Sequence, residues 1–368
     1  LLGRRSVFLT NGEVWKRQRR ILNPAFEGGR VRDSFSAMLD AIRSTIQTTR
    51  PGEQDVEPLA SRLAADIIFR SLFSIPISHE IAEKVFREFR TYQRAAPILN
   101  LTAFLPFLPG FHSRKTHQSA RAIRTLITKL VDWRLAQIDH GNAPDDLATR
   151  ILTQTDPETG QGLDRDEMID QVALFFLAGH ETSAAVLAWA LFLLADHPQV
   201  QERVAAEAAT LPGSPSFAEL SKLPFTRDLF RETLRLYPPV PMMVRETTKP
   251  ELFRNRVLKR RAQVVVSPWH LHRHHDYWPD PDSFDPDRYA TDKGRACLRE
   301  AFIPFSSGAR VCVGAGFAMA EGVLSLALLT RHFRFSAVRN RRPVPQAHLT
   351  VRSANGIWLA IRPRAADR

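Results

Sequence analysis

One cysteine lies on a glycine-bracketed loop in the stretch from Phe305 to Gly314. Gly308 and Gly314 flank Cys312, and glycine permits tight turns and lets a bulky group approach the backbone without a Cβ clash. An apolar helical pattern follows Gly314, so the positive end of a helix dipole would face the sulfur and favour a thiolate. Arg310 adds a cation suited to an anionic group, and Phe305 can shield the loop from water.

Taken alone, this loop leaves open a buried and inert cysteine on an ordinary turn. Its spacing of phenylalanine, glycine, arginine, cysteine and glycine resembles the haem-binding loop of the cytochrome P450 monooxygenases. The resemblance implies that Cys312 is the axial thiolate ligand of one b-type haem (iron protoporphyrin IX). It also implies haem contacts for Phe305, Gly308, Arg310 and Gly314. A thiolate ligand pushes electron density toward iron and favours O–O cleavage.

A second polar group interrupts the longest helical pattern, which runs from Leu163 to Asp196. Ala178 and Gly179 are small enough to leave room for a ligand, and a hydroxyl such as that of Thr182 can bond to the preceding turn and open the helix. A core helix with a polar kink is the alternative. Beside the cysteine loop, the stretch resembles the family's oxygen-binding groove. This implies that Thr182 steadies dioxygen and that Glu181 is the acid of a proton relay, because O–O cleavage consumes two protons.

Three further positions are expected to hold haem propionates, again by the resemblance. Trp15 and Arg19 share one face of a short predicted helix, Glu13 to Leu22. Arg245 follows an extended, proline-containing segment at the distance where the family places a second propionate-binding arginine. A solvated basic helix face and a surface strand residue are the respective alternatives.

Glu232 and Arg235 lie three residues apart on one face of the helix predicted over Phe225 to Leu236. Taken alone, such a pair is a surface ion pair contributing under about 1 kcal/mol. The family buries an equivalent pair against an arginine from a later segment, which is here Phe284 to Arg288. The resemblance therefore implies a structural triad of Glu232, Arg235 and Arg288.

Four residues are expected to line an apolar substrate pocket: Ala178, Val240, Met242 and Ala354. They do not distinguish a terpene, a steroid, a fatty acid or an aromatic substrate. The apolar, proline-bounded segment 97–111 has three open interpretations: a lid, core packing or a monotopic membrane contact. A turn at Ala354 to Gly356 between apolar strands predicts a hairpin that reaches the pocket.

The composition permits a large hydrophobic core, since 44% of the 368 residues are hydrophobic. Two cysteines cannot form a disulfide framework, which favours a reducing, cytoplasmic location. Polar residues at its middle mark the segment Val172 to Ala195 as a core helix, not a membrane span. We expect a single domain over residues 1–368, mainly α with a smaller β region. The resemblance supplies the P450 fold.

Helical patterns are also predicted over 31–49, 57–74, 80–95, 113–140 and 198–210, with a strand at 264–266. The sequence departs from the family in two places. It begins just before the Trp15 helix, as though the segment that builds the first sheet in relatives were absent. Residues Asn255 to Arg261 are basic and free of glycine, which predicts a distorted or mobile hairpin.

The expected reaction inserts one atom of O2 into an apolar organic substrate, with electrons from an acidic ferredoxin or flavodoxin. Exposed cations near the cysteine face would dock that donor: Lys16, Arg17, Arg20 and Arg299. The alternatives are a haem-thiolate sensor or carrier and a peroxide-using or isomerase variant.

The net charge of +12 raises the question of a nucleic-acid partner. Only Trp15 is interleaved with the basic residues, which disfavours nucleic acid. Membrane contact is not expected. The crowded histidines of 270–275 are geometrically awkward ligands for one metal ion.

Overall fold

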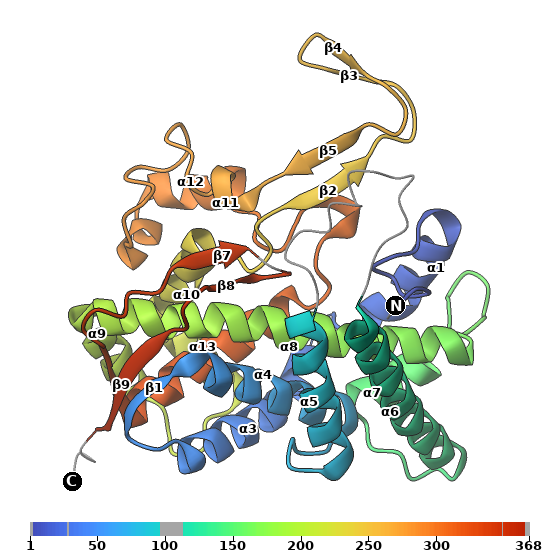
Figure 1. Ribbon diagram of the computed structural model, residues 1–368, viewed down its shortest axis with the longest axis horizontal. Coiled ribbons are helices and arrows are strands. Elements are labelled where there is room, and N and C mark those ends of the chain that lie inside the picture. The colour runs from blue at the N-terminus through green and yellow to red at the C-terminus, as the bar shows by residue number, and fades with distance from the viewer. Residues whose placement is uncertain (1–2, 28, 96–112, 348, 365–368) are drawn as a thin grey trace.

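A computed structural model describes residues 3–27, 29–95, 113–347 and 349–364 (Figure 1). The α-helices are α1 (Gly12–Leu22), α2 (Arg30–Asp33), α3 (Phe35–Thr48), α4 (Val56–Phe73), α5 (Glu80–Ala95), α6 (Arg114–Asp139), α7 (Leu147–Thr153), α8 (Arg165–Asp196), α9 (Pro198–Ala209), α10 (Pro224–Leu236), α11 (Pro268–Leu271), α12 (Asp292–Glu300) and α13 (Ala315–His332). The strands are β1 (Gly52–Asp55), β2 (Met243–Glu246), β3 (Glu251–Phe253), β4 (Arg256–Leu258), β5 (Gln263–Val266), β6 (Phe333–Ala337), β7 (Pro345–Ala347), β8 (Val351–Ser353) and β9 (Trp358–Pro363). The mainly α class with a smaller β region is confirmed. The apolar segment 97–111 lies outside the described residues.

Helix α8 runs through the middle of the molecule, with other helices packed along it (Figure 1). Its start is fixed by a capping box: Asp164 accepts from the Glu167 backbone N–H at 2.9 Å, and Glu167 accepts from the Asp164 N–H at 3.1 Å. The helix is long and apolar enough to cross a membrane, but 78% of its most apolar window is buried inside the protein. It is a core helix, as predicted.

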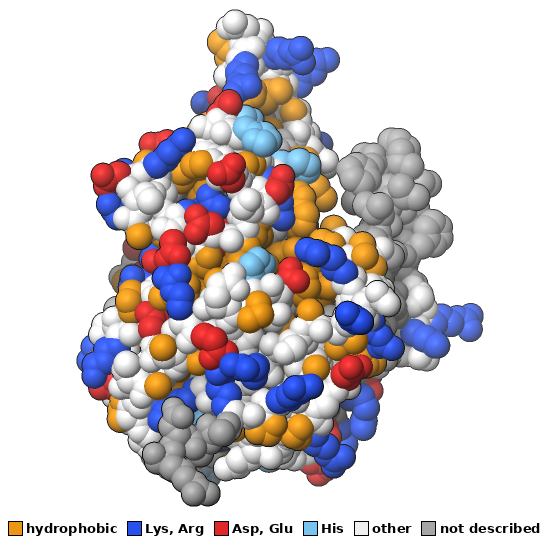
Figure 2. All heavy atoms as spheres, turned by 90° about the vertical axis from the view of Figure 1, so that its left-hand side faces the viewer, with side chains coloured by type: hydrophobic (Ala, Val, Ile, Leu, Met, Phe, Trp, Pro, Cys, Tyr) orange, Lys and Arg blue, Asp and Glu red, His pale blue; other side chains and the backbone are white. Residues whose placement is uncertain are grey.

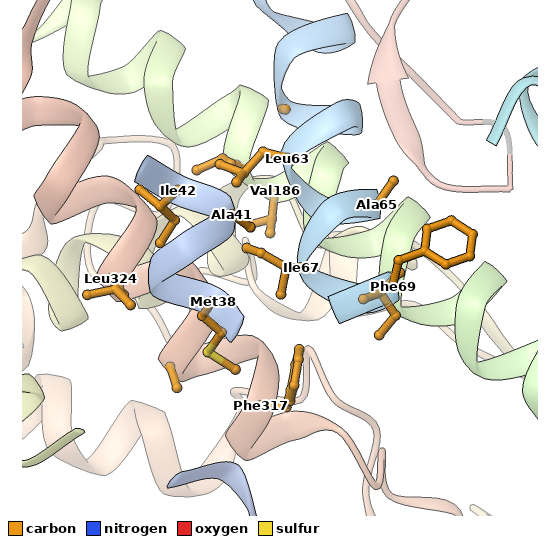
Figure 3. Close-up of a cluster of buried hydrophobic side chains, with 14 of the residues drawn as sticks. Met38, Ala41, Ile42, Leu63, Ala65, Ile67, Phe69, Val186, Phe317 and Leu324 are labelled. Atoms are coloured by element: carbon orange, nitrogen blue, oxygen red, sulfur yellow. The ribbon is translucent and has the colours of Figure 1, made fainter. Parts of the chain in front are cut away.

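The core forms where α3, α4, α8 and α13 meet (Figure 3). Ala41 of α3 lies toward Ile67 of α4 and Val186 of α8, and Met38 of α3 lies toward Phe317 of α13. Gly179 of α8 serves this packing, because a Cβ there would lie 2.9 Å from Ile68 Cδ1 of α4. The glycine therefore makes room for a neighbouring helix rather than for a ligand.

The sheets are small and antiparallel. β9 pairs with both β1 and β6, β2 pairs with β5, β3 with β4, and β7 with β8. The prediction of a C-terminal hairpin is therefore wrong. The chain does turn at Gly356, whose φ is +76°, but β8 and β9 enter different sheets instead of pairing with each other.

The expected distortion after Phe253 is also absent. β3 and β4 form a regular ladder of three residue pairs, closed by a two-residue turn at Arg254 and Asn255. Both turn residues have positive φ, 45° and 62°, as a type I′ hairpin turn requires. Glycine is the usual residue at such positions, and this chain makes the turn without it.

The carboxylate of Glu232 is completely buried and accepts hydrogen bonds from Arg235, Arg288 and Tyr289. Its ion pairs with Arg235 and Arg288 measure 2.8 and 2.9 Å. Asp285 N–H donates to the same carboxylate at 3.0 Å. The three side chains of the predicted triad thus meet away from solvent. Such a buried network supports the fold only while every charge in it is paired, because removal of one partner leaves a buried charge uncompensated.

This network reaches the cysteine loop through His272. Arg235 donates to the His272 carbonyl oxygen at 2.9 Å and also to the carbonyl of Ser283. The His272 ring accepts from the Ile303 backbone N–H at 2.9 Å and stacks on Phe302. Burial lowers the pKa of His272 to about 3, so the ring stays neutral. The triad therefore supports the backbone just before the loop begins at Phe305.

We predict that Glu232→Gln strongly destabilises the protein, because two buried arginines lose the one carboxylate that pairs with them among the described residues. The free energy of unfolding, measured in urea, should fall by about 3–5 kcal/mol. The matched control is Asp287→Asn, which breaks the exposed Arg203–Asp287 pair and should cost under about 1 kcal/mol. Equal effects of the two substitutions would refute the assignment.

Candidate functional site

The loop from Phe305 to Gly314 is folded back on itself by backbone hydrogen bonds. Cys312 N–H donates to the Phe305 carbonyl at 2.9 Å, and Val311 N–H donates to the Gly308 carbonyl at 3.0 Å. Gly308 has a φ of +70°, which favours glycine, whereas Gly314 has an ordinary φ of −88° and caps α13. The cysteine thus lies two residues before the cap of a long helix.

The Cys312 side chain is exposed, yet the protein atoms around it displace much of its water. This desolvation raises the pKa of the Cys312 thiol, while the Gly314 backbone N–H and the nearby Arg19 lower it. The net shift is upward. As long as no metal is bound, desolvation therefore opposes the thiolate that the helix end favours. Coordination to a metal would deprotonate the thiol directly.

Arg310 joins this loop to the N-terminal part of the chain. Its guanidinium lies 4.2 Å from the ring centroid of Trp15. It donates to the carbonyl oxygens of Val7 and Thr10 at 3.3 and 2.9 Å, and to the Asn11 side chain at 2.8 Å. These bonds hold the start of α1 against the loop and so bring Trp15 to the site.

Two more arginines approach the loop from other elements. Arg19 of α1 donates to the Val311 carbonyl at 3.0 Å, and Arg245 of β2 donates to Ser306 Oγ at 3.0 Å. Burial, together with repulsion from the nearby cations Arg245 and Arg19, lowers the pKa of Arg310. In the described part of the chain, none of the three forms an ion pair with a carboxylate.

These arginines and the cysteine fit a haem. The exposed sulfur could ligate the haem iron, and an unneutralised cluster of three cations beside it would suit two propionate groups. Phe305 is half-buried and packs against the main core, where it supports the loop. The sequence-predicted cofactor residues Trp15, Arg19, Arg245, Phe305, Gly308, Arg310, Cys312 and Gly314 are brought together, although the chain contributes them from three separate regions.

On α8, Ala178 is exposed in the middle of an otherwise buried helix, and Thr182 one turn later is half-buried. Thr182 Oγ1 donates to the Ala178 carbonyl at 2.7 Å. The helix continues without a break through this turn, so the predicted local opening is absent. One face of α8 is thus accessible at the place where the sequence puts an alcohol.

Comparison with known proteins identifies the family. A family model described as "Cytochrome P450" matches residues 3–359. The chain belongs to the cytochrome P450 family. It is accordingly a haem-dependent oxidoreductase of the monooxygenase type with a cysteine thiolate ligand.

Among relatives, the P450 is 33% identical to cyclooctat-9-en-7-ol 5-monooxygenase of Streptomyces melanosporofaciens, over 94% of this chain and 74% of that protein. It is 32% identical to human cytochrome P450 4A11, over 97% of this chain and 73% of that protein. The crystal structure of the cytochrome P450DA heme domain superimposes with a TM-score of 0.85 at 27% identity, covering 99% of this chain and 81% of that one. The predicted fold is confirmed.

Glu181 of this P450 is buried and fully engaged. Arg352 of β8 donates to both of its oxygens, at 2.7 and 2.6 Å, and Thr350 donates at 2.8 Å. Gln93 of α5 also donates to it. Burial alone would raise the pKa of Glu181, but these donors outweigh it and lower the pKa. The carboxylate is therefore held ionised, and a role as relay acid requires it to leave Arg352.

Sequence reasoning missed Arg352 and also Glu321. Ser183 Oγ donates to the Glu321 carboxyl at 2.8 Å, which ties α8 to α13 one residue after Thr182. Glu321 lies seven residues after Gly314, about 10 Å along the helix axis. A carboxyl inside the apolar run of α13 was the only signal in the sequence, and Arg352 had none beyond its alternation with Thr350.

The expected pocket residues are distributed over three segments. Ala178, Met242 and Ala354 are exposed and Val240 is half-buried. β8 and the segment before β2 are joined by the Val351 N–H, which donates to the Pro239 carbonyl at 3.0 Å. That the four residues line a single pocket stays a prediction.

We predict that Glu321 makes stability fall as pH rises. Complete burial raises the pKa of Glu321 from 4.5 to about 8, so between these values the folded protein binds a proton that the unfolded chain releases. The contribution of Glu321 to the free energy of unfolding is therefore highest below pH 4.5 and falls as pH rises from 4.5 to about 8. Glutamine cannot ionise, so Glu321→Gln should gain about 4 kcal/mol over the wild type between pH 5 and 9.

Urea unfolding at pH 5, 7 and 9 measures this difference. Glu53→Gln, at an exposed glutamate of β1, is the control and should leave the pH dependence unchanged. A constant difference between wild type and Glu321→Gln across the pH range would show that the carboxyl ionises normally.

Proposed function

We propose that this P450 inserts one atom of O2 into an apolar organic substrate, with Cys312 as the axial ligand of a b-type haem. The observation that carries the proposal is the exposed Cys312 sulfur beside three arginines that lack carboxylate partners in the described structure. When bound, the haem supplies the activation of dioxygen, and the thiolate ligand favours O–O cleavage. Arg19, Arg245 and Arg310 would hold its propionates.

On the other side of the site, the protein supplies protons and shape. Thr182 offers a hydroxyl on the accessible face of α8, already held by its bond to the Ala178 carbonyl. Glu181 is ionised against Arg352, so it can accept a proton from solvent once it leaves that partner. Thr350 and Gln93, as further donors to Glu181, would set how readily it leaves.

The apolar character of Ala178, Val240, Met242 and Ala354 supports an apolar substrate. The named relatives include a cyclooctat-9-en-7-ol 5-monooxygenase, a name consistent with an apolar substrate for that protein. We propose the same broad substrate class for this chain, in the cytoplasm.

We propose an acidic ferredoxin or flavodoxin as electron donor, but its docking residues need revision. Lys16 pairs with Glu13, Arg17 with Glu167, and Arg20 with Asp156. These pairs neutralise much of the positive charge predicted for α1. Arg299 of α12 is exposed and, within the described residues, forms no ion pair, so it keeps its predicted docking role.

The first test is the absorption spectrum of the dithionite-reduced, haem-loaded protein with carbon monoxide. We expect a Soret band at the red-shifted thiolate position, which Cys312→His should abolish. Cys297→Ser is the matched control, because the Cys297 thiol is buried and donates to the Tyr277 carbonyl. A band that persists in Cys312→His would overturn the ligand assignment.

A second test separates turnover from a sensor, carrier, peroxide-using or isomerase function. With an electron donor and an apolar substrate that perturbs the haem spectrum, Thr182→Val should lower product formed per O2 consumed at least tenfold and release hydrogen peroxide. Thr233→Val is the matched control, since Thr233 makes the same bond one turn back on α10, to Leu229 at 3.0 Å. No O2 consumption by the haem-loaded wild type would favour a sensor or carrier.

A further inference from the structure

The β3–β4 hairpin projects from the body of the protein, at the top of Figure 1. It is inserted between β2 and β5, and Thr247 pins its base. Thr247 Oγ1 donates to the Lys259 carbonyl at 2.6 Å, and its backbone N–H donates to the Ala262 carbonyl at 3.0 Å. The hairpin therefore has a fixed base and a regular ladder, yet it covers no part of the core.

Large apolar side chains lie on this hairpin in contact with solvent. Leu252 and Val257 are directly opposite each other in the ladder and are 72% and 70% exposed. Phe253 is 61% exposed. A paired apolar surface of this kind, on a projecting element, marks a site of interaction with another surface.

Five cations surround these apolar residues. All five are exposed, and among the residues that the structure describes none of them forms an ion pair: Arg254, Arg256, Lys259, Arg260 and Arg261. Glu251, an acidic residue of the same hairpin, lies 3.8 Å from Lys249, which partly neutralises it. Figure 2 shows Lys and Arg side chains beside hydrophobic ones at the top of the molecule, where the hairpin projects.

We propose that the β3–β4 hairpin docks on the surface of an anionic lipid bilayer. Clustered cations are attracted to anionic headgroups, at about 1 kcal/mol for each residue near the surface. Three-residue strands span about 10 Å, comparable with the depth to which an interfacial segment enters the headgroup region. Leu252 and Val257, which share one face of the hairpin, insert, and the five cations contact the headgroups.

A nucleic acid would also attract the cations, but the hairpin has few of the groups that bind single strands. Base stacking uses aromatic rings. The hairpin presents one, Phe253, and the Arg254 guanidinium lies 5.8 Å from the centroid of that ring. The apolar pair Leu252 and Val257 therefore favours lipid. From the sequence, membrane contact stays open for segment 97–111 alone, and this proposal adds the β3–β4 hairpin as a second region.

The test is co-sedimentation of the haem-loaded protein with vesicles of phosphatidylcholine alone or with one quarter phosphatidylglycerol, at low and high salt. We expect binding to the anionic vesicles and at least tenfold weaker binding to the neutral ones. The triple variant Arg256→Gln, Arg260→Gln, Arg261→Gln should bind the anionic vesicles about 100-fold more weakly. Leu252→Ser with Val257→Ser should weaken binding tenfold or more at high salt, where the charge contribution is screened.

The matched control removes three exposed cations on the helices α4, α5 and α6: Arg62→Gln, Arg87→Gln and Arg121→Gln. It should bind anionic vesicles like the wild type. Circular dichroism and thermal unfolding must show that every variant is folded.

Three results would overturn the proposal. The first is equal binding to both kinds of vesicle, and the second is an equal loss of binding in the control variant. The third is that the protein binds a DNA duplex but not vesicles, and that the hairpin variant abolishes the binding to DNA.

Discussion

The buried carboxylate of Glu232 is the constraint on which the site depends. A charge with no solvent must be satisfied completely, because an unpaired partner costs several kcal/mol. Glu232 therefore fixes Arg235 and Arg288, and Arg235 fixes the backbone at His272. The neutral His272 ring then holds Ile303, two residues before the loop that presents the sulfur. Rigid support far from the chemistry determines where Cys312 can lie.

The electrostatics of the loop are those of a site built for a cofactor. Desolvation keeps the Cys312 thiol from ionising by itself, while three arginines gather nearby without carboxylate partners among the described residues. A bound metal would favour the deprotonated thiol, and a bound anion would neutralise the arginines. Arg310 also holds the chain together, since it donates to the backbone before α1.

Helix α8 packs closely against other helices on one side and leaves another face accessible. One side packs so closely on α4 that a Cβ at Gly179 would displace the Ile68 side chain, and Ser183 is tied to the Glu321 carboxyl of α13. Another face stays accessible at Ala178 and Thr182. Helix packing therefore leaves the Thr182 hydroxyl on the accessible face, while Arg352 of β8 holds the Glu181 carboxylate in place.

The sequence by itself determined most of the long helices, the cysteine loop and, through that loop, the family, because hydrophobic periodicity and loop spacing are local properties. It also predicted which residues would meet at the site, but only through the family resemblance. Tertiary structure alone decided what Arg352 and Glu321 contact, that β8 and β9 join different sheets, and that desolvation raises the pKa of Cys312. Burial, charge pairing and strand partners depend on residues far apart in the chain, and no local pattern records them.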